Sequence, residues 1–563
     1  MTKRAPFLFL FSSLSAFFIF GRTLDSRAAQ SSSPSPRRDA DRLATLLRAG
    51  SFREADKLAA TLLADPAIDM PTRAVCGLAV LKAGRISEAE ALFNKVLSVS
   101  PDNPEAHLGL GRIGRIRNDL DTAVSHLRQA VPSAAFYEEA LRQFFRSAWD
   151  RGWVSDLIEI RRLAEERYGR ESRPLPSLFA NGLAQVQGLA GKRLFQMEGR
   201  FERLAVPLLR NEDRRIRIRM IALKLNGKGE YPIDIDSASA DFLTVSPLLA
   251  EELGLSLTGN STATGVGTAT AAVRFSMLDK VELGGIAFRN VPVMVSDIHT
   301  FRGLKKGLLG TGLLKRFNVA IDVEAEVMTL YPLDRPELLA AGIDRAAVAA
   351  DVPLYLFDAT IVEASMAGAP PALYILDSAA ATNLVDRAFF EENIKPKLDP
   401  ARIFRSGIQG AQGAQEVNRI DGLSIGLGSL VFDGQTVHEF SMEELNSIGA
   451  RYTAGLLGNP LLWPYRVHMD FRAGRLILEK YRGPQRGGRR SFDPALKSCY
   501  TSLIRHGESV LHLECREFFP PVPKVPSRTG ATSFNPSPGT RQEPKEANDE
   551  QPKKTPRDEV FLP

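Results

Sequence analysis

The feature that most constrains the fold of this chain is a duplication in its C-terminal half. The segment DSASADFLTVS at residues 236–246 recurs as DSAAATNLVDR at 377–387, and Gly227 and Gly368 each stand nine residues before the first aspartate. GLLGTGLL at 307–314 likewise recurs as GLLGNPLL at 455–462. Matches at several separate offsets indicate an internal repeat. We therefore expect two similar lobes, one after the other along the chain.

Each block of the duplication has the period of a β-structure. From residue 215 the sequence RIRIRM alternates Arg with Ile or Met, and the chain then reaches Asn226 and Gly227, a dipeptide typical of a tight hairpin turn. An apolar strand then runs into Asp236, and the matching strand of the second block runs into Asp377. Each block continues with a glycine-containing segment, at residues 265–267 and 407–413, before its Leu-Leu-Gly motif.

This ordered set of motifs resembles the retropepsin-like aspartic proteases, here in the two-lobed, single-chain form of the pepsin-like enzymes. The resemblance covers residues 214–335 and 351–482. It implies a catalytic pair, Asp236 and Asp377, with Ser237 and Ser378 hydrogen-bonded across the lobe interface. It further implies a set of flap and peptide-binding residues and two structural glycines: Gly265, Val266, Gly267, Gly407 and Gly410 for the former, and Gly310 and Gly458 for the latter.

The chemistry that such a pair supports explains why duplication matters. Two carboxylates within hydrogen-bonding reach cannot both ionise cheaply, so they share one proton. One carboxylate then acts as general base on a water molecule while the other acts as acid. We expect neither a metal nor a cofactor. The resemblance implies an aspartic endopeptidase whose substrate is an extended peptide or protein, bound by strand-like backbone hydrogen bonds.

Two features depart from the family pattern. Ala238 and Ala379 follow the Asp-Ser pairs, where the family has glycine; an alanine keeps its backbone N–H, but its Cβ takes space and narrows the allowed dihedrals. Asp234 stands two residues before Asp236 on the same strand face, where it should raise neighbouring carboxyl pKa values or need a partner. A second interpretation therefore stays open: a catalytically inactive domain that binds peptides or proteins.

The region before the lobes, residues 39–200, is rich in Ala and Leu and has helical periodicity. Two sets of small or turn-forming residues recur every 34 positions: Gly50, Gly84 and Asn118, and Ala55, Ala89 and Ala123. Small residues are needed where helices cross closely, and Gly or Asn where the chain turns. The pattern resembles tetratricopeptide repeats, which implies a surface for a protein partner. The predicted fold class is multidomain α + β, with a helical array followed by a bilobal, mainly β domain.

The N-terminus has the three-part layout of a secretory signal. Lys3 and Arg4 precede an apolar stretch at residues 6–20, and small residues follow around Ala28. We expect residues 1–29 to direct export to the periplasm or the medium, with residues 30–38 as a linker. An uncleaved membrane anchor is the alternative. No other segment is long and apolar enough to cross a bilayer.

Cysteine content and charge limit the remaining possibilities. Three cysteines exclude a disulfide scaffold; Cys76 should pack on a helix face, while Cys499 and Cys515 are candidates for one disulfide in a short extension, residues 483–517. Residues 518–563 are rich in Pro, Lys and Glu and should be disordered. A net charge of +6, without a basic run interleaved with aromatics, argues against a nucleic-acid partner. The sequence does not determine the oligomeric state.

Overall fold

The computed structural model describes residues 7–9, 36–186, 189–209, 218–263, 271–297, 304–410, 413–449 and 451–482. Several predictions concern residues outside these ranges. They include Gly265, Val266 and Gly267, the pair Cys499 and Cys515, most of the expected export signal, and the C-terminal extension and tail. These remain predictions.

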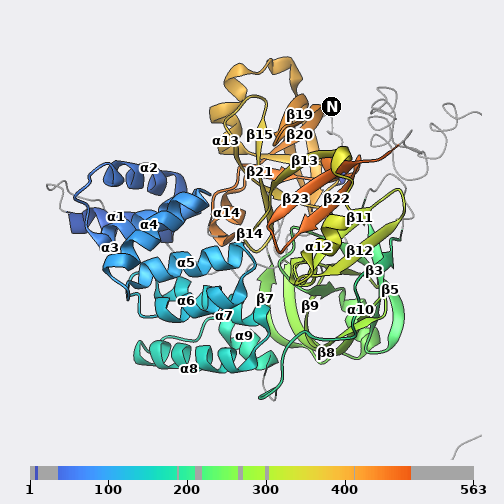
Figure 1. The fold of residues 1–563 in the computed structure, drawn as a ribbon, viewed down its shortest axis with the longest axis horizontal. Coiled ribbons are helices and arrows are strands. Elements are labelled where there is room, and N and C mark those ends of the chain that lie inside the picture. Colours follow the sequence, from blue (N-terminus) through green and yellow to red (C-terminus); the bar gives the residue numbers. More distant parts are fainter. Residues whose placement is uncertain are drawn as a thin grey trace, which may run out of the picture. The chain divides into compact units, whose positions relative to one another are not determined.

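The N-terminal part of the described chain is an array of helices in which successive helices pack against each other (Figure 1). Among the helices of the described ranges, none has both the length and the hydropathy needed to span a bilayer. The helices are α1 (Pro36–Ala49), α2 (Phe52–Leu63), α3 (Met70–Lys82), α4 (Ile86–Val99), α5 (Pro104–Ile116), α6 (Leu120–Ala130), α7 (Tyr137–Arg151), α8 (Val154–Arg170) and α9 (Ser177–Gln185).

The 34-residue spacing marks the turns and the close crossings of this array. Gly50, Gly84 and Asn118 lie between paired helices with φ values of 80°, 92° and 58°, in the left-handed region that Gly and Asn tolerate best. The three alanines of the repeat are fully buried. A Cβ added to Gly77 would lie 2.6 Å from the ring of Phe93, which shows how closely α3 and α4 approach. The predicted helical repeat is therefore confirmed.

The first lobe is built on a sheet with strand order β2-β9-β6-β10-β5-β4-β8-β7. The hairpin predicted at Asn226 and Gly227 joins β4 to β5. Because β2 pairs with β9, the segment after α9 belongs to this lobe and not to the helical array. The elements are β2 (Gln196–Glu198), β4 (Met220–Leu225), β5 (Lys228–Ile235), β6 (Leu243–Val245), α10 (Pro247–Leu253), β7 (Thr258–Ala263), β8 (Ala271–Leu283), β9 (Ile286–Ser296), β10 (Gly307–Leu309) and α11 (Thr311–Leu314).

The second lobe has a sheet with order β1-β18-β19-β20-β17-β21-β16-β15-β14. It repeats the centre of the first: β21 pairs in parallel with β16 and antiparallel with β17, as β10 does with β5 and β6. The elements are β1 (Phe7–Phe9), β14 (Tyr355–Leu356), β15 (Thr360–Met366), β16 (Ala372–Leu376), β17 (Asn383–Asp386), α13 (Arg387–Asn393), η3 (Lys395–Lys397), η4 (Pro400–Arg402), β18 (Ile403–Gly410), β19 (Gly413–Leu427), β20 (Leu430–Phe440), α14 (Glu443–Gly449), β21 (Gly455–Leu457) and α15 (Asn459–Leu462).

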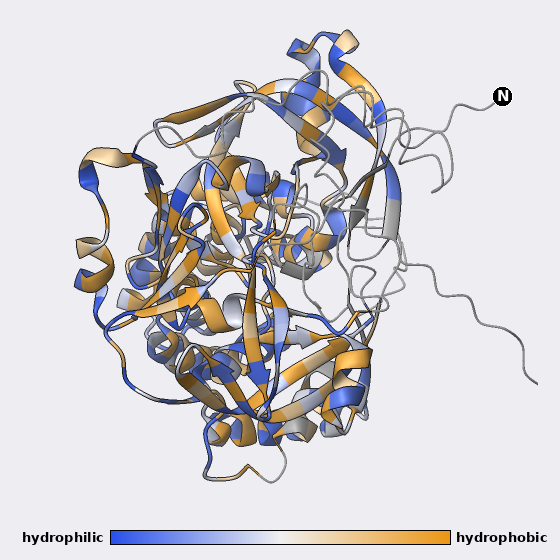
Figure 2. Ribbon diagram, turned by 90° about the vertical axis from the view of Figure 1, so that its right-hand side faces the viewer, coloured by the Kyte–Doolittle hydropathy of each residue, from blue (hydrophilic) through white to orange (hydrophobic). Residues whose placement is uncertain are grey.

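A third sheet joins the two lobes, with order β13-β23-β22-β11-β12-β3. Its central pair, β11 from the first lobe and β22 from the second, is antiparallel with Ala320 opposite His468. Apolar and polar residues are interspersed along the strands and helices (Figure 2), as amphipathic elements around a core require. The elements are β3 (Leu204–Pro207), β11 (Phe317–Asp322), β12 (Val327–Pro332), α12 (Pro336–Ala341), η2 (Arg345–Ala347), β13 (Val348–Pro353), β22 (Tyr465–Asp470) and β23 (Arg475–Lys480).

Candidate active site

The two candidate aspartates occupy equivalent places in the two lobes. Asp236 directly follows β5, and Asp377 directly follows β16. Each donates its backbone N–H to the last residue of the neighbouring Leu-Leu strand: Asp236 to the carbonyl of Leu309 and Asp377 to that of Leu457, both at 2.9 Å. The parallel pairing of these strands therefore fixes where each Asp-Ser turn begins.

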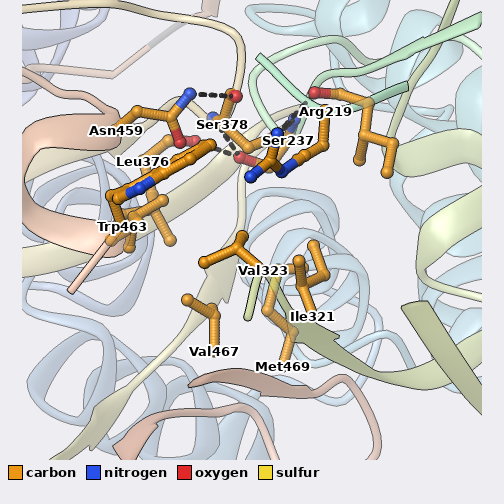
Figure 3. Close-up of a pocket in the computed structure, with 12 residues that line it drawn as sticks. Arg219, Ser237, Ile321, Val323, Leu376, Ser378, Asn459, Trp463, Val467 and Met469 are labelled. Atoms are coloured by element: carbon orange, nitrogen blue, oxygen red, sulfur yellow. Dashed lines mark hydrogen bonds between the residues drawn. The ribbon is translucent and has the colours of Figure 1, made fainter. Parts of the chain in front are cut away.

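Reciprocal hydrogen bonds between two serines hold the turns together. The backbone N–H of Ser237 donates to Oγ of Ser378, and the backbone N–H of Ser378 donates to Oγ of Ser237, each at 3.0 Å. Each hydroxyl then donates across the interface, from Ser237 to the carbonyl of Leu376 at 2.7 Å and from Ser378 to that of Ile235 at 2.9 Å. The structure thus brings together the two serines that the sequence places next to the aspartates (Figure 3).

Backbone N–H groups cradle both carboxylates. Oδ1 of Asp236 accepts from the N–H of Ala238 at 2.7 Å and from that of Ser239 at 3.1 Å. Oδ1 of Asp377 accepts from the N–H of Ala379 at 2.8 Å. Both aspartates are fully buried. One oxygen of each carboxylate is therefore held in place by its own turn, as positioned acid and base groups require.

Alanine fits the position where the family pattern has glycine. Neither Ala238 nor Ala379 has a positive φ, so neither turn demands the backbone freedom of glycine. Both side chains are buried, at 0% and 2% exposure, and both backbone N–H groups reach their aspartate. The substitution leaves the cradle of each carboxylate intact.

Steric crowding explains why Gly310 and Gly458 are glycines. A Cβ added to Gly310 would lie 2.4 Å from the carbonyl oxygen of Asp241, and one added to Gly458 would lie 2.4 Å from that of Thr382. Each glycine lets its Leu-Leu strand pass against the segment that follows the Asp-Ser turn of its lobe. Next to Gly458, Asn459 donates its side-chain amide to the carbonyl of Ser378 at 2.6 Å (Figure 3).

Thr360 is a site residue that the sequence reasoning missed. Its hydroxyl lies 2.9 Å from the carbonyl oxygens of both Ser237 and Leu376, and it is fully buried. Thr360 precedes Asp377 by seventeen residues, and the same offset before Asp236 gives Arg219, so comparison of the two repeats was the available signal. Arg219 lies over the ring of Trp463 at 4.0 Å, beside a small apolar cavity beneath the serine pair (Figure 3).

Asp234 forms an ion pair with Lys306. Oδ2 of Asp234 lies 2.7 Å from Nζ of Lys306, and their side chains are 5% and 10% exposed. Burial raises the pKa of Asp234, and the nearby ammonium of Lys306 opposes the shift. The sequence indicated that this extra carboxylate would either raise the pKa values of neighbouring carboxyl groups or need a partner. The structure provides the partner, Lys306.

Removing this partner should destabilise the first lobe in a pH-dependent way. Lys306→Met leaves a buried carboxylate unpaired, so we expect the free energy of unfolding at pH 7 to fall by about 3 kcal/mol. The folded-state pKa of Asp234, already raised, would rise further. The deficit should therefore shrink as the pH falls and Asp234 takes up a proton. Urea unfolding at pH 4 and pH 7 measures both effects.

The neighbouring lysine provides a matched control for this prediction. Lys305 pairs with Glu252, but its side chain is 58% exposed, so Lys305→Met should cost at most about 1 kcal/mol. Equal losses in the two variants, or a loss in Lys306→Met that does not vary with pH, would contradict the assignment of Lys306 as the buried partner.

The candidate flap residues of the second lobe lie in a hairpin. Gly407 and Gly410 lie on β18, which pairs antiparallel with β19. In the first lobe β7 pairs with β8, and residues 265–267 between them lie outside the described ranges. The outer edge of β18 pairs in parallel with the short strand β1 (Phe7–Phe9). This edge can therefore accept an extended segment.

Other polar residues of the lobes, and the thiol of Cys76, are engaged in structural contacts or buried. Oδ1 of Asp322 accepts from the N–H groups of Glu324 and Ala325, and Asp470 makes the same type of turn with Arg472 and Ala473. His468 is buried with its Nε2 2.8 Å from Glu479, in the sheet that joins the lobes. Cys76 is a buried free thiol, and burial raises its pKa to about 12.

Comparison with known proteins gives two family matches. The family model described as aspartyl protease matches residues 221–313, and the model described as tetratricopeptide repeat matches residues 77–148. No curated protein matches the sequence.

Solved structures give further matches at low identity. MamA AMB-1 is 16% identical over 28% of this chain and 83% of its own, with a TM-score of 0.21. MamA MSR-1 is 17% identical over 28% of this chain and 87% of its own, also with a TM-score of 0.21. Basic 7S globulin from soybean is 9% identical over 50% of this chain and 95% of its own, with a TM-score of 0.30.

Proposed function

Because this chain carries an aspartyl protease domain and tetratricopeptide repeats, we propose that it is an aspartic endopeptidase with Asp236 and Asp377 as its catalytic pair. The observation that carries the proposal is the reciprocal pair of 3.0 Å hydrogen bonds between Ser237 and Ser378. These bonds place side by side the two Asp-Ser turns, one from each lobe. Each lobe supplies one aspartate of the proposed pair.

The proposed reaction uses one shared proton. The ionised carboxylate removes a proton from a water molecule while the water oxygen bonds to the peptide carbonyl carbon. The protonated carboxyl group gives its proton to the carbonyl oxygen. When the tetrahedral intermediate collapses, the C–N bond breaks and the leaving nitrogen takes a proton from one carboxyl group. A hydroxyl of the intermediate returns a proton to the other carboxylate, so the pair again holds one proton. One shared proton suits such a pair, because two ionised carboxylates within hydrogen-bonding reach would repel each other.

An extended peptide is the substrate that suits such a domain. Hairpin β18–β19 presents a strand edge, and that edge already pairs with the three residues of β1. Backbone hydrogen bonds to such an edge bind a peptide of any sequence, and side-chain pockets then select among sequences. The helical array is proposed to bind a protein, either a partner or part of a large substrate.

The proposed place of action is outside the cytoplasm. It is supported by Lys3 and Arg4 followed by the apolar stretch at residues 6–20. N-terminal sequencing of the mature protein should then find a cleavage near residue 29. A protein that keeps Met1 would count against a cleaved signal and favour the anchor.

The pH dependence of hydrolysis tests the proposed mechanism. A pair that must carry one proton gives a bell-shaped profile of kcat/KM, because activity falls when both carboxyls are protonated and again when both are ionised. The expected result, measured on a quenched fluorescent peptide, is a maximum between mildly acidic and neutral pH. A rate that rises steadily into alkaline pH would contradict a carboxyl pair.

A second candidate function is peptide binding without turnover. It is favoured by one observation, the buried Cβ groups of Ala238 and Ala379 beside both carboxylates. This candidate predicts saturable peptide binding with no products after prolonged incubation. Hydrolysis that depends on Asp236 would exclude it.

A further inference from the structure

A second cavity lies where the helical array meets the first lobe. Its volume is about 120 Å³, and it opens to solvent at its mouth. Helix α7 contributes Phe145 and Trp149, and the first lobe contributes Phe242, Phe275 and Met294. The cavity is distinct from the small one beneath the serine pair, with which it shares no lining residue.

This cavity begins at the catalytic turn. Its lining includes Ala240 and Asp241, which follow Asp236 by four and five residues. Four residues of chain span at most about 14 Å, at about 3.6 Å per residue. The segment after the turn packs closely against Gly312. A Cβ added to Gly312 would lie 2.6 Å from the backbone nitrogen of Phe242. The mouth of the cavity is therefore within reach of a peptide that lies across the pair.

Five of the twelve uncharged residues that line the cavity in the described part of the chain are aromatic. The rings of Phe145 and Trp149 stack at 5.6 Å between centroids, and Phe242 stacks on Phe195 at 4.9 Å. Gly182 of α9 leaves room at the back, since a Cβ there would lie 2.3 Å from the ring of Phe145. Such walls favour an apolar group of matching size, because aromatic contacts add to the free energy of apolar burial.

The charged side chains at the cavity balance one another. Nζ of Lys315 lies 2.6 Å from Asp150, and Arg115 and Arg146 both pair with Asp358. Asp241 brings the number of acidic side chains to three, equal to the number of basic ones. A charged ligand group would have to break existing ion pairs, so an uncharged group fits best.

We propose that this cavity is an extended subsite for a bulky apolar side chain, such as phenylalanine, of a bound peptide. Helix α7 of the array forms one wall of the subsite. A reach of at most about 14 Å, at about 3.3 Å per residue, places the side chain no more than about four peptide residues from the scissile bond. The inference rests on the proposed peptidase function for its ligand, and it assigns the array a part in substrate selection.

Binding can be measured without turnover in the full chain carrying Asp236→Asn. The probe is a set of dye-labelled decapeptides in which one position at a time is Phe, Ala or Glu, and the readout is fluorescence anisotropy. We expect Phe at one or two adjacent positions to lower Kd about tenfold relative to Ala, as burial of a ring in an apolar site provides. Glu should bind no better than Ala.

Two substitutions on opposite walls of the cavity test whether the preference for Phe arises there. Trp149→Ala removes an aromatic wall, and Met294→Trp narrows the cavity from the first lobe. Each should reduce the preference for Phe over Ala at least about fivefold, since each changes the apolar contact area. The control is Trp153→Ala, because Trp153 is 41% exposed and lies outside the cavity. It should leave the preference unchanged.

The outcomes separate the subsite from the peptidase proposal. A preference for Phe that survives both Trp149→Ala and Met294→Trp, in variants that melt like their parent, would overturn the subsite. Equal binding of Phe, Ala and Glu at every position would do the same, even if the wild type cleaves peptides. Phe selection through Trp149 in a protein that cleaves nothing would support the subsite and refute the peptidase.

Discussion

Asp236→Asn and Asp377→Asn should each lower kcat by about 10³-fold or more, because either change removes half of a shared acid and base unit. An asparagine keeps a side-chain oxygen that can accept the backbone N–H of Ala238 or Ala379. The turns should therefore persist, and peptide affinity should change little. The kcat of the double variant should be about equal to that of the slower single variant, because the two groups act as one unit. Single-turnover kinetics and peptide binding on the same preparations measure both quantities.

Asp470 offers the control for these variants. It also ends a strand and accepts two backbone N–H bonds in a turn, but it lies in the sheet that joins the lobes. Asp470→Asn should keep kcat close to the wild-type value. Loss of activity of the same size in all three variants would point to general damage by Asp-to-Asn exchange instead of a catalytic pair.

Asp358→Asn should cause the largest loss of stability among single substitutions at the junction of the array and the lobes. Asp358 lies in the turn between β14 and β15, and it pairs with Arg115 of α5 and Arg146 of α7. All three side chains are largely buried, at 10%, 9% and 16% exposure. Asparagine removes the negative charge that both buried guanidinium groups share. We therefore expect the free energy of unfolding to fall by about 3–5 kcal/mol.

Asparagine is the informative substitution because Asp358 has a φ of 68°. Asparagine tolerates this left-handed conformation, whereas alanine would add backbone strain. The control is Asp351→Asn, since Asp351 pairs with Arg475 but is 34% exposed; it should cost at most about 1 kcal/mol. Urea unfolding, with limited proteolysis of the array as a local readout, compares the two. Equal midpoints would show that the ion pairs at Asp358 do not hold the array.

The electrostatics of Asp358 keep its ion pairs intact in mild acid. Burial favours the neutral acid, but Arg115 and Arg146 outweigh it and hold the pKa of Asp358 well below its usual range. A lowered carboxyl pKa contributes stability that is complete above the unfolded value of about 3.9. That contribution is lost only as the pH falls further, toward the folded value. The array therefore stays attached at the pH where a carboxyl pair is active.

Residues at regular spacings allowed the sequence to predict much of the fold. Gly84 and Asn118 recur at 34 residues because each helix pair needs a left-handed residue at its turn. Gly310 and Gly458 recur because the same strand passes the same turn in both lobes. The positions of Ser237 and Ser378 beside the aspartates likewise predicted their contact, which the structure confirms.

Contacts between single charged residues far apart in the chain had no such signal. Asp358 meets Arg115 across 243 residues, and neither position belongs to a repeat or a motif. Lys306 can form its ion pair with Asp234 because β10 pairs with β5. The docking of the array on the lobes, and with it the aromatic cavity at α7, depends on such contacts. These features followed from the three-dimensional fold and not from any local pattern.

The most direct test of the account is digestion of a mixed peptide library by the purified full chain in ¹⁸O-labelled water, beside the Asp236→Asn/Asp377→Asn double variant. We expect internal cleavages with ¹⁸O in one new carboxyl group, found with the wild type and absent with the double variant. Intact peptides after incubation with a folded wild-type protein, or equal cleavage by the double variant, would contradict it.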